Sequence, residues 1–417
     1  MRRPRPEGRF WRLWLTFAAL VAVMAIGAGC GGDDDDDGGD SGEPIKIGIS
    51  LPRTGEFSQP GKAAQQGYEV WRDTVNAEGG LLDRQVELVI RDDASDQNTV
   101  VADYNSLISQ ENVDLLLGTF SSLLNLPASA AAERNRMLYV EPAGGAPEIF
   151  ERDFQYGPFF TQQATADKQG DLFVEWVLGL PENERPKTAA YPVLDDPFTV
   201  PVIDAIKAKF EDAGIETVYE DVYPASTSNF DSIANAVKSA NPDLVANGAQ
   251  FDDGVGFRRS LTKVGFEPKI LFQTNAPSFG QQYADGVGAQ NTEGTFFAIS
   301  HTPDADTPGN QEFVQKFAAT FNGEEPAEDA ADAYASGQVL QAAVDGVGSI
   351  DDQLALADWL RDNTVETILG PLQWEDTGAP IGEFLIGQWQ NGQAEIILPP
   401  DAATSDQIIA VRPAAQQ

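Results

Sequence analysis

The sequence predicts an α/β fold with two Rossmann-like lobes, each built on a parallel sheet. Two observations predict this class. Apolar residues alternate with polar ones at Ile45, Ile47 and Ile49 and then recur at helical spacing, and this succession of strand and helix patterns occurs twice along the chain. From Glu43 to Gln417 the chain has 375 residues, which is enough for two cores rather than one.

The first run of elements extends from residue 45 to about residue 140. Alternating and short buried apolar patterns predict strands at 45–51, 86–90, 115–117 and 138–140. Apolar residues at helical spacing predict helices at 64–75, 101–108 and 128–134. Strands that alternate with helices pair in parallel, so this run predicts one lobe.

After a segment rich in glycine and proline, the alternation begins again. The second run predicts strands at 188–191, 217–222, 244–246 and 270–272, and helices at 202–212, 233–239 and 255–264. The tail has a different pattern. It predicts helices at 312–321, 329–347 and 351–362, followed by strand-like segments at 371–374, 383–390 and 395–398.

The first 29 residues have the pattern of an export signal. Residues 1–12 carry five arginines and one glutamate, residues 13–26 are apolar, and small residues precede Cys30. The apolar run is shorter than the roughly 20 residues of a membrane-spanning helix. Because Cys30 is the only cysteine, no intramolecular disulfide is possible.

The segment that ends at Cys30 resembles a bacterial lipoprotein lipobox. That resemblance implies cleavage after residue 29 and diacylation of Cys30, whose acyl chains would anchor the protein to the cell membrane on its periplasmic or extracellular face. Gly27 departs from the pattern, which usually has an aliphatic residue there. An ordinary signal peptide followed by a chance cysteine is the alternative.

Residues 30–43 predict an acidic tether. They combine glycines with five consecutive aspartates at 33–37, which repel one another and keep the segment solvated. A calcium site is the alternative, but the spaced oxygen ligands of a calcium loop are missing.

The charge of the mature chain excludes some partners. Removing the five arginines and one glutamate of residues 1–29 from 27 basic and 65 acidic residues leaves 22 and 64, a net charge of −42. Such a chain repels nucleic acid and anionic membrane surfaces. No second long apolar segment follows the leader, so nothing else in the sequence predicts a membrane span.

Candidate ligand loops follow from the predicted topology. In open parallel sheets, ligands bind beyond the carboxyl ends of the strands. This rule selects the loops 52–61, 119–123, 142–146, 192–199, 247–253 and 274–278. Ser121 and Ser122 offer hydroxyl and backbone N–H groups at a helix start, where an anion or carbonyl is favoured. Simple helix capping is the alternative for this pair.

A series of short motifs resembles the branched-chain amino-acid-binding proteins of the type I periplasmic-binding family. The motifs occur in order as IGISLPRTG at 47–55, NAEGGLL at 76–82, RDDASD at 91–96, GTFSS at 118–122, PA at 142–143 with APE at 146–148, GPLQW at 370–374 and GQWQNG at 387–392. Each motif alone is weak, and the ordered series is the specific signal. It covers the chain from about residue 45 to residue 399.

The resemblance implies two lobes that are joined by three crossovers and close on a ligand like a hinge. The predicted division assigns 44–160 and 292–372 to lobe 1, and 161–291 and 373–417 to lobe 2. The family also implies a monomer that captures a small-molecule ligand and delivers it to the permease of an ABC importer. A binding protein that reports to a membrane sensor is an alternative that the sequence leaves open.

The family's pocket, carried over residue by residue, implies a set of ligand-binding positions: Ser121, Ser122, Ala143, Gly144, Gly145, Phe198, Gln250, Phe251, Asn275 and Tyr334. The serines would hold a ligand carboxylate or carbonyl. Tyr334 would close the pocket from a late helix. Gly145 stands where amino-acid binders usually have threonine, so that hydroxyl is missing.

One departure from the family concerns the charge of the pocket. Amino-acid binders usually place a carboxylate in the loop that here contains Thr274 and Asn275, to pair with the ligand's ammonium group. A buried ammonium without a counter-charge is unfavourable. Four aspartates near pocket loops are possible substitutes, although each also fits a surface acid on a very acidic chain: Asp195, Asp196, Asp252 and Asp253. The ligand is therefore a small polar solute of open identity, such as an amino acid, an amide or a small carboxylate.

The sequence offers little support for an enzyme. His301 is the only histidine, and no Gly-x-Ser-x-Gly turn accompanies it. No glycine-rich dinucleotide motif follows the first strand. We therefore expect no catalytic residues, no cofactor and no metal, and an exported hydrolase is the remaining alternative.

Overall fold

The computed structural model describes residues 42–411. The predicted signal peptide, Cys30 and nearly all of the predicted tether lie outside these residues. Among the described residues, no helix combines the length and apolar character that crossing a bilayer requires.

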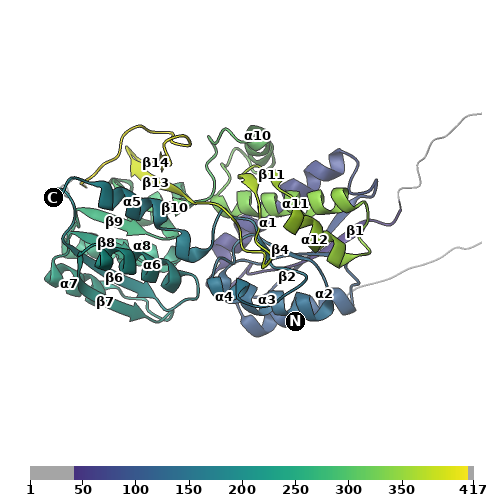
Figure 1. The fold of residues 1–417 in the computed structure, drawn as a ribbon, viewed down its shortest axis with the longest axis horizontal. Helices are drawn as coiled ribbons and strands as arrows, with labels where there is room; N and C mark the ends of the chain where they lie inside the picture. The colour runs from purple at the N-terminus through teal and green to yellow at the C-terminus, as the bar shows by residue number, and fades with distance from the viewer. Residues whose placement is uncertain (1–41, 412–417) are drawn as a thin grey trace, which may run out of the picture. The chain divides into compact units, whose positions relative to one another are not determined.

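A five-stranded parallel sheet is formed by the first run of elements (Figure 1). Its order is β2-β1-β3-β4-β5, with β1 at Ile45–Leu51, β2 at Val86–Asp92, β3 at Leu115–Leu117, β4 at Tyr139–Glu141 and β5 at Phe159–Phe160. In β3, Leu115 and Leu117 face one core and Leu116 faces another. A central strand that is buried on both faces reads as a continuous apolar run for this reason.

Helices cover both faces of this sheet. One core contains side chains of α1 (Ser58–Ala77), α10 (Asn310–Thr320), α11 (Glu328–Val347) and α12 (Gln353–Asp362). The other contains side chains of α2 (Gln97–Ser109) and α3 (Ser122–Asn135). The short helix α4 spans Pro147–Phe150.

Glycines allow α1 and α11 to pack closely. A Cβ atom at Gly67 would lie 1.9 Å from the carbonyl oxygen of Ala330, and one at Gly337 would lie 2.2 Å from the Trp71 ring. These distances are too short for any side chain, so the contact requires glycine at both positions. The close packing holds α11 against α1 and thereby fixes the position of the first turn of α11.

A seven-stranded sheet is formed by the second run and the tail (Figure 1). Its order is β14-β13-β10-β9-β8-β6-β7, with β6 at Thr188–Leu194, β7 at Glu216–Tyr223, β8 at Leu244–Asn247, β9 at Ile270–Gln273, β10 at Thr295–Ile299, β13 at Leu385–Gln390 and β14 at Gln393–Leu398. The strand β13 runs antiparallel to both of its neighbours, β10 and β14, and all other neighbouring strands of this sheet pair in parallel. A separate two-stranded sheet pairs β11 (Val365–Thr367) with β12 (Gly370–Leu372).

This sheet is also covered on both faces. The helices α5 (Asp171–Gly179) and α6 (Thr199–Asp212) pack on one face, and α7 (Asp231–Ala240) and α8 (Phe251–Val264) pack on the other. The helix α9 (Gln281–Val287) packs beside β10 and β13. Short 3₁₀ turns occupy Ala166–Lys168 (η1), Ala276–Phe279 (η2) and Ala289–Asn291 (η3).

The chain crosses between the layers of the two sheets three times, after β5, after β10 and after β12. The predicted fold class is therefore confirmed. The predicted division places residues 292–372 in lobe 1, whereas β10, at Thr295–Ile299, pairs with β9 and β13 in the second sheet. The apolar run of β10 is buried throughout and has no alternation that marks it as a strand. The division into lobes as a whole stays a prediction.

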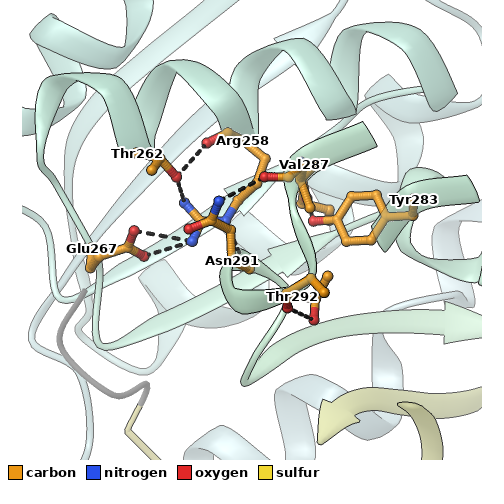
Figure 2. Close-up of polar contacts among 9 residues, drawn as sticks. Arg258, Thr262, Glu267, Tyr283, Val287, Asn291 and Thr292 are labelled. Carbon is orange, nitrogen blue, oxygen red and sulfur yellow. Dashed lines mark hydrogen bonds and ion pairs between the residues drawn. The ribbon is translucent and has the colours of Figure 1, made fainter. Parts of the chain in front are cut away.

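A buried ion pair holds the region around α8 together (Figure 2). Arg258, whose side chain is only 2% exposed, donates from Nη2 to both carboxylate oxygens of Glu267 at 3.0 Å. It also donates from Nη1 to the Thr262 hydroxyl at 2.9 Å and from Nε to the Asn291 carbonyl at 2.9 Å. We call these four residues the arginine cluster. Its charges are matched, so it has the composition of a structural link.

Candidate ligand-binding site

A cavity lies where loops of both sheets meet; the space between its lining residues, counted together with the adjoining open solvent, is about 510 Å³. From the first sheet and its helices, the lining residues are Phe120, Ser121, Ala143, Gly145, Phe160, Glu328 and Asp329. The segment after β5 contributes Gln162, Ala164, Ala166 and Gln169. From the second sheet and the tail, the lining residues are Phe198, Gln250, Thr274, Asn275, Ala298 and Phe384. As predicted, most of the lining comes from the carboxyl ends of parallel strands.

Ser121 is the most unusual residue of the lining. It lies between β3 and α3 with φ 73° and ψ 148°, a conformation that is almost confined to glycine. Its side chain is buried, and its hydroxyl has no hydrogen-bond partner among the described residues. Helix capping was the alternative for this residue, but its side chain caps nothing. A strained backbone with an unused buried hydroxyl is typical of a residue that serves a ligand.

Ser122 has a structural contact instead. Its hydroxyl accepts a hydrogen bond from the Ala146 backbone N–H at 3.0 Å. This bond joins the start of α3 to the loop after β4, and Ser122 does not line the cavity. Its predicted contact with a ligand stays a prediction that the geometry does not support.

The loop after β4 presents backbone to the cavity at Ala143 and Gly145, whereas Gly144 packs on Glu141. A Cβ atom at Gly144 would lie 2.6 Å from Oε1 of Glu141. Oε2 of Glu141 accepts from the Ala143 N–H at 2.9 Å, and Oε1 has no partner among the described residues. Burial raises the pKa of Glu141 to about 8, against the opposing effect of the backbone N–H groups.

Three predicted residues from the second sheet line the cavity. Phe198 is the N-cap residue just before α6, Gln250 is the N-cap residue just before α8, and Asn275 follows β9. The amide of Asn275 donates to Oε1 of Gln250 at 2.7 Å, so these two side chains are already joined. Phe251 is predicted as a fourth, but it packs on Phe279 with ring centres 4.7 Å apart and lines a different cavity.

Tyr334 does not line the cavity, and its predicted contact with a ligand stays a prediction. Its ring packs on Phe313 with centroids 4.6 Å apart, inside the core between α1, α10 and α11. On the same helix, Glu328 and Asp329 line the cavity. Successive residues of a helix are rotated by about 100°, so five or six residues further on the side chain points to the other side.

The acids that line the cavity come from the first turn of α11. Glu328 accepts hydrogen bonds from Ser300 at its Oε1, from the backbone N–H at 2.5 Å and from the hydroxyl at 2.9 Å. Behind it, Asp332 accepts at Oδ1 from the Ser300 hydroxyl at 2.6 Å and at Oδ2 from the Gln162 amide at 2.6 Å. We call Glu328, Asp329 and Asp332 the acidic cluster. Their spacing at i, i+1 and i+4 places them on neighbouring faces of one helix and is visible in the sequence, but none of the three is among the predicted site residues.

The four aspartates considered as substitutes do not line this cavity. Oδ1 of Asp196 accepts from the backbone N–H groups of Phe198 and Thr199, which start α6. Asp253 accepts from the Gln250 N–H at 2.9 Å and from the Tyr223 hydroxyl at 2.7 Å. Asp195 and Asp252 are exposed. These acids therefore cap helices or face solvent.

His301 also has a structural environment. It is buried, and its Nε2 lies 2.7 Å from Oδ1 of Asn310. Burial lowers the pKa of His301 to about 4. Among residues 42–411, no group of three or more histidine, cysteine, aspartate or glutamate side chains is placed to hold a metal ion.

Comparison with known proteins decides the family, because the model of the periplasmic binding protein family matches residues 44–394. The chain belongs to this family. An amino acid binding protein from Pseudomonas aeruginosa is 23% identical over 348 residues, which are 83% of this chain and 90% of the relative. A Leu/Ile/Val-binding protein homolog from Brucella melitensis is 26% identical over 353 residues, which are 84% of this chain and 92% of the relative. The resemblance to the branched-chain amino-acid-binding group is thereby confirmed.

Solved structures of periplasmic binding proteins have the same fold. A leucine binding protein from Thermotoga maritima superposes with a TM-score of 0.76 at 20% identity and covers 86% of this chain and 99% of that chain. A solute binding protein from R. palustris in complex with benzoate gives 0.75 at 22% identity, with 88% and 99% covered. A branched-chain amino acid binding protein from Streptococcus pneumoniae in complex with isoleucine gives 0.75 at 18% identity, with 85% and 100% covered. These matches show that the fold carries ligands as different as isoleucine and benzoate in other proteins.

Proposed function

We propose that this periplasmic binding protein captures a small polar solute in the cavity between its two lobes and delivers it to the permease of an ABC importer. The observation that carries the proposal is the cavity itself. Loops of both sheets line it, and it contains the strained Ser121 with an unused hydroxyl. Buried polar groups without partners are unfavourable in the free protein, and a ligand that hydrogen-bonds to them is favoured.

A thermal-shift screen tests the proposal directly. The panel contains amino acids, amides, urea and small carboxylates. A ligand at 100 times its dissociation constant should add about 2.7 kcal/mol to the free energy of unfolding. If no compound in a broad panel stabilises the protein, the proposal of a small-solute cavity fails.

The proposal includes closure of two lobes on the ligand. Three crossovers between the two sheets form a natural hinge. Small-angle scattering should show a smaller radius of gyration when a ligand identified in the screen is added. If the radius of gyration is the same with and without the ligand, the lobes do not close on binding and the site is rigid.

The proposal also includes export and a lipid anchor at Cys30. The support is the leader pattern and the small residues before the lone cysteine. Cys30→Ala should move the protein from the membrane fraction to the soluble fraction. Mass spectrometry of the wild-type protein checks the same point, because an unacylated Cys30 contradicts the anchor.

A further inference from the structure

Acidic side chains are concentrated on one wall of the cavity, and no basic side chain of the lining opposes them. The wall is the first turn of α11, with Glu328 and Asp329 at the surface of the cavity and Asp332 behind them. The lining includes no lysine and no arginine. Within residues 42–411, no ion pair joins a basic side chain to any of the three acids.

The internal hydrogen bonds do not satisfy these acids. The Ser300 hydroxyl has one proton but lies 2.9 Å from Oε1 of Glu328 and 2.6 Å from Oδ1 of Asp332. It donates to only one of them, so the other contact requires a proton on a carboxyl group. Among residues 42–411, Asp329 accepts only from its own backbone N–H, and burial together with the charge of Glu328 raises its pKa well above the usual range. The cluster therefore has unmet capacity for positive charge.

Two buried polar atoms on the same cavity point independently to a ligand. The Ser121 hydroxyl and Oε1 of Gln169 have no partner among the described residues, and the side chains are only 2% and 6% exposed. The remaining walls include the rings of four phenylalanines, Phe120, Phe160, Phe198 and Phe384. Aromatic faces attract organic cations and also cover their alkyl parts.

We propose that the ligand carries an ammonium or guanidinium group at the end of an alkyl chain, which binds against Glu328 and Asp329 while the alkyl chain lies among the phenylalanines. This inference rests on the proposed function and names the chemical class of the solute. The counter-charge for the ligand's cation then comes from α11 and not from the loop after β9, where Asn275 is neutral.

Matched ligands separate this proposal from the proposed function. The probes are agmatine, L-arginine and L-lysine as cations. L-citrulline is the counterpart of arginine with an uncharged side chain, and L-norleucine is that of lysine, so both keep the α-ammonium and lack only the terminal cation. Benzoate, urea and acetamide complete the panel. We expect at least one cation to bind, by calorimetry, at least tenfold more tightly than its counterpart with an uncharged side chain.

Variants locate the cation. Glu328→Gln and Asp329→Asn should each weaken the bound cation at least tenfold, because each removes one negative charge and keeps the shape. The matched control is Glu325→Gln, an exposed acid just before α11, which should leave the affinity unchanged. Both cavity variants should also melt at a temperature equal to or above that of the wild type, because they relieve repulsion between buried acids.

The contrary outcomes are distinct. If only neutral or anionic probes bind, or if arginine and citrulline bind equally, the cation proposal is wrong and the proposed function stands. If calcium ions alone stabilise the protein and Glu328→Gln abolishes the effect, the acids hold a metal ion and the proposal is again wrong. If nothing in the panel binds, both the cation proposal and the proposed function fail.

Discussion

The arginine cluster and the acidic cluster are both buried groups of charged side chains, but they differ in balance. In the arginine cluster, Arg258 faces Glu267, and its guanidinium group donates four hydrogen bonds of 2.9 to 3.0 Å. In the acidic cluster, Glu328 and Asp332 share a single hydroxyl proton of Ser300. The arginine cluster pairs its positive charge with a carboxylate of the same protein. The acidic cluster has no basic side chain and needs a proton or a bound cation to balance it.

The difference shows that burial alone does not distinguish a structural group of charges from a ligand-binding one. Buried charges are unfavourable unless they are paired, so a matched pair is compatible with a purely structural role. An unmatched group persists only where another requirement keeps it, and binding is the usual one. Pairing, and not burial, therefore separates the structural region from the candidate site in this molecule.

The largest expected effect comes from breaking the arginine cluster. Arg258→Ala should remove the guanidinium group that faces the largely buried Glu267 and lower the free energy of unfolding by about 3–5 kcal/mol. Urea denaturation monitored by circular dichroism measures this loss. The neighbouring Arg259 is exposed, so Arg259→Ala should change the stability little. A loss below about 1 kcal/mol for Arg258→Ala would mean that the arginine cluster does not stabilise the fold, and the contrast with the acidic cluster would fail.

Glu141 tests an intermediate case, because only one of its two carboxylate oxygens has a partner. Burial raises the pKa of Glu141 from its ordinary value of 4.5 to about 8 in the folded protein. Between these values the folded state holds a proton that the unfolded state has lost. This group's contribution to stability therefore falls as the pH rises, by about 1.4 kcal/mol per pH unit.

Glu141→Gln should remove that contribution. The wild type and the variant are compared by denaturation from pH 5 to pH 8, and the difference in their free energies of unfolding should move in favour of the variant by a few kcal/mol. A difference that stays constant over this range would mean that Glu141 is ionised in the folded protein. Comparing the two proteins at each pH cancels the titration of the other buried acids, which include Asp93 and Asp253.

Variants of Ser121 test whether a single buried hydroxyl serves the fold or the ligand. Because the Ser121 Oγ has no partner in the described part of the chain, Ser121→Ala should change the stability of the ligand-free protein by no more than about 0.5 kcal/mol. Ser121→Gly should gain roughly 1 kcal/mol over the alanine variant, since glycine adopts φ 73° without strain. If the hydroxyl binds the ligand, both variants should weaken binding equally by calorimetry. A large loss of stability in Ser121→Ala would instead assign the hydroxyl to the fold.

Much of the fold was predictable because the strands carry local patterns. The alternation at Ile45, Ile47 and Ile49 predicted β1, and the structure forms it at Ile45–Leu51. The strand β10 was missed, since its run of Phe296, Phe297 and Ala298 is buried on both faces and has no period. Its membership of the second sheet depends on pairing with β13, which is far away in sequence.

The site was predictable only in part, and α11 shows why. Ser121, Ala143, Gly145, Phe198, Gln250 and Asn275 line the cavity, as the predicted strand ends require. The orientation of α11 about its own axis could not be predicted from the sequence. The first half of this helix is rich in alanine and buried nearly all round, so no single apolar face marks the side that packs on the core. The family resemblance then selected Tyr334, while the tight contacts at Gly67 and Gly337 turn the acids toward the cavity.

The smallest expected effect compares the two sides of α11. Tyr334 lies in the core against Phe313, so Tyr334→Phe keeps the ring and removes only the hydroxyl. We expect the stability to change by less than about 1 kcal/mol and the affinity for any ligand found in the screen to stay the same. Glu328→Gln, on the cavity side of the same helix, is the contrasting variant, because it should change affinity and leave the stability equal or higher. A tenfold loss of affinity in Tyr334→Phe would restore the family's tyrosine to the site and would mean that α11 turns about its axis when the ligand binds.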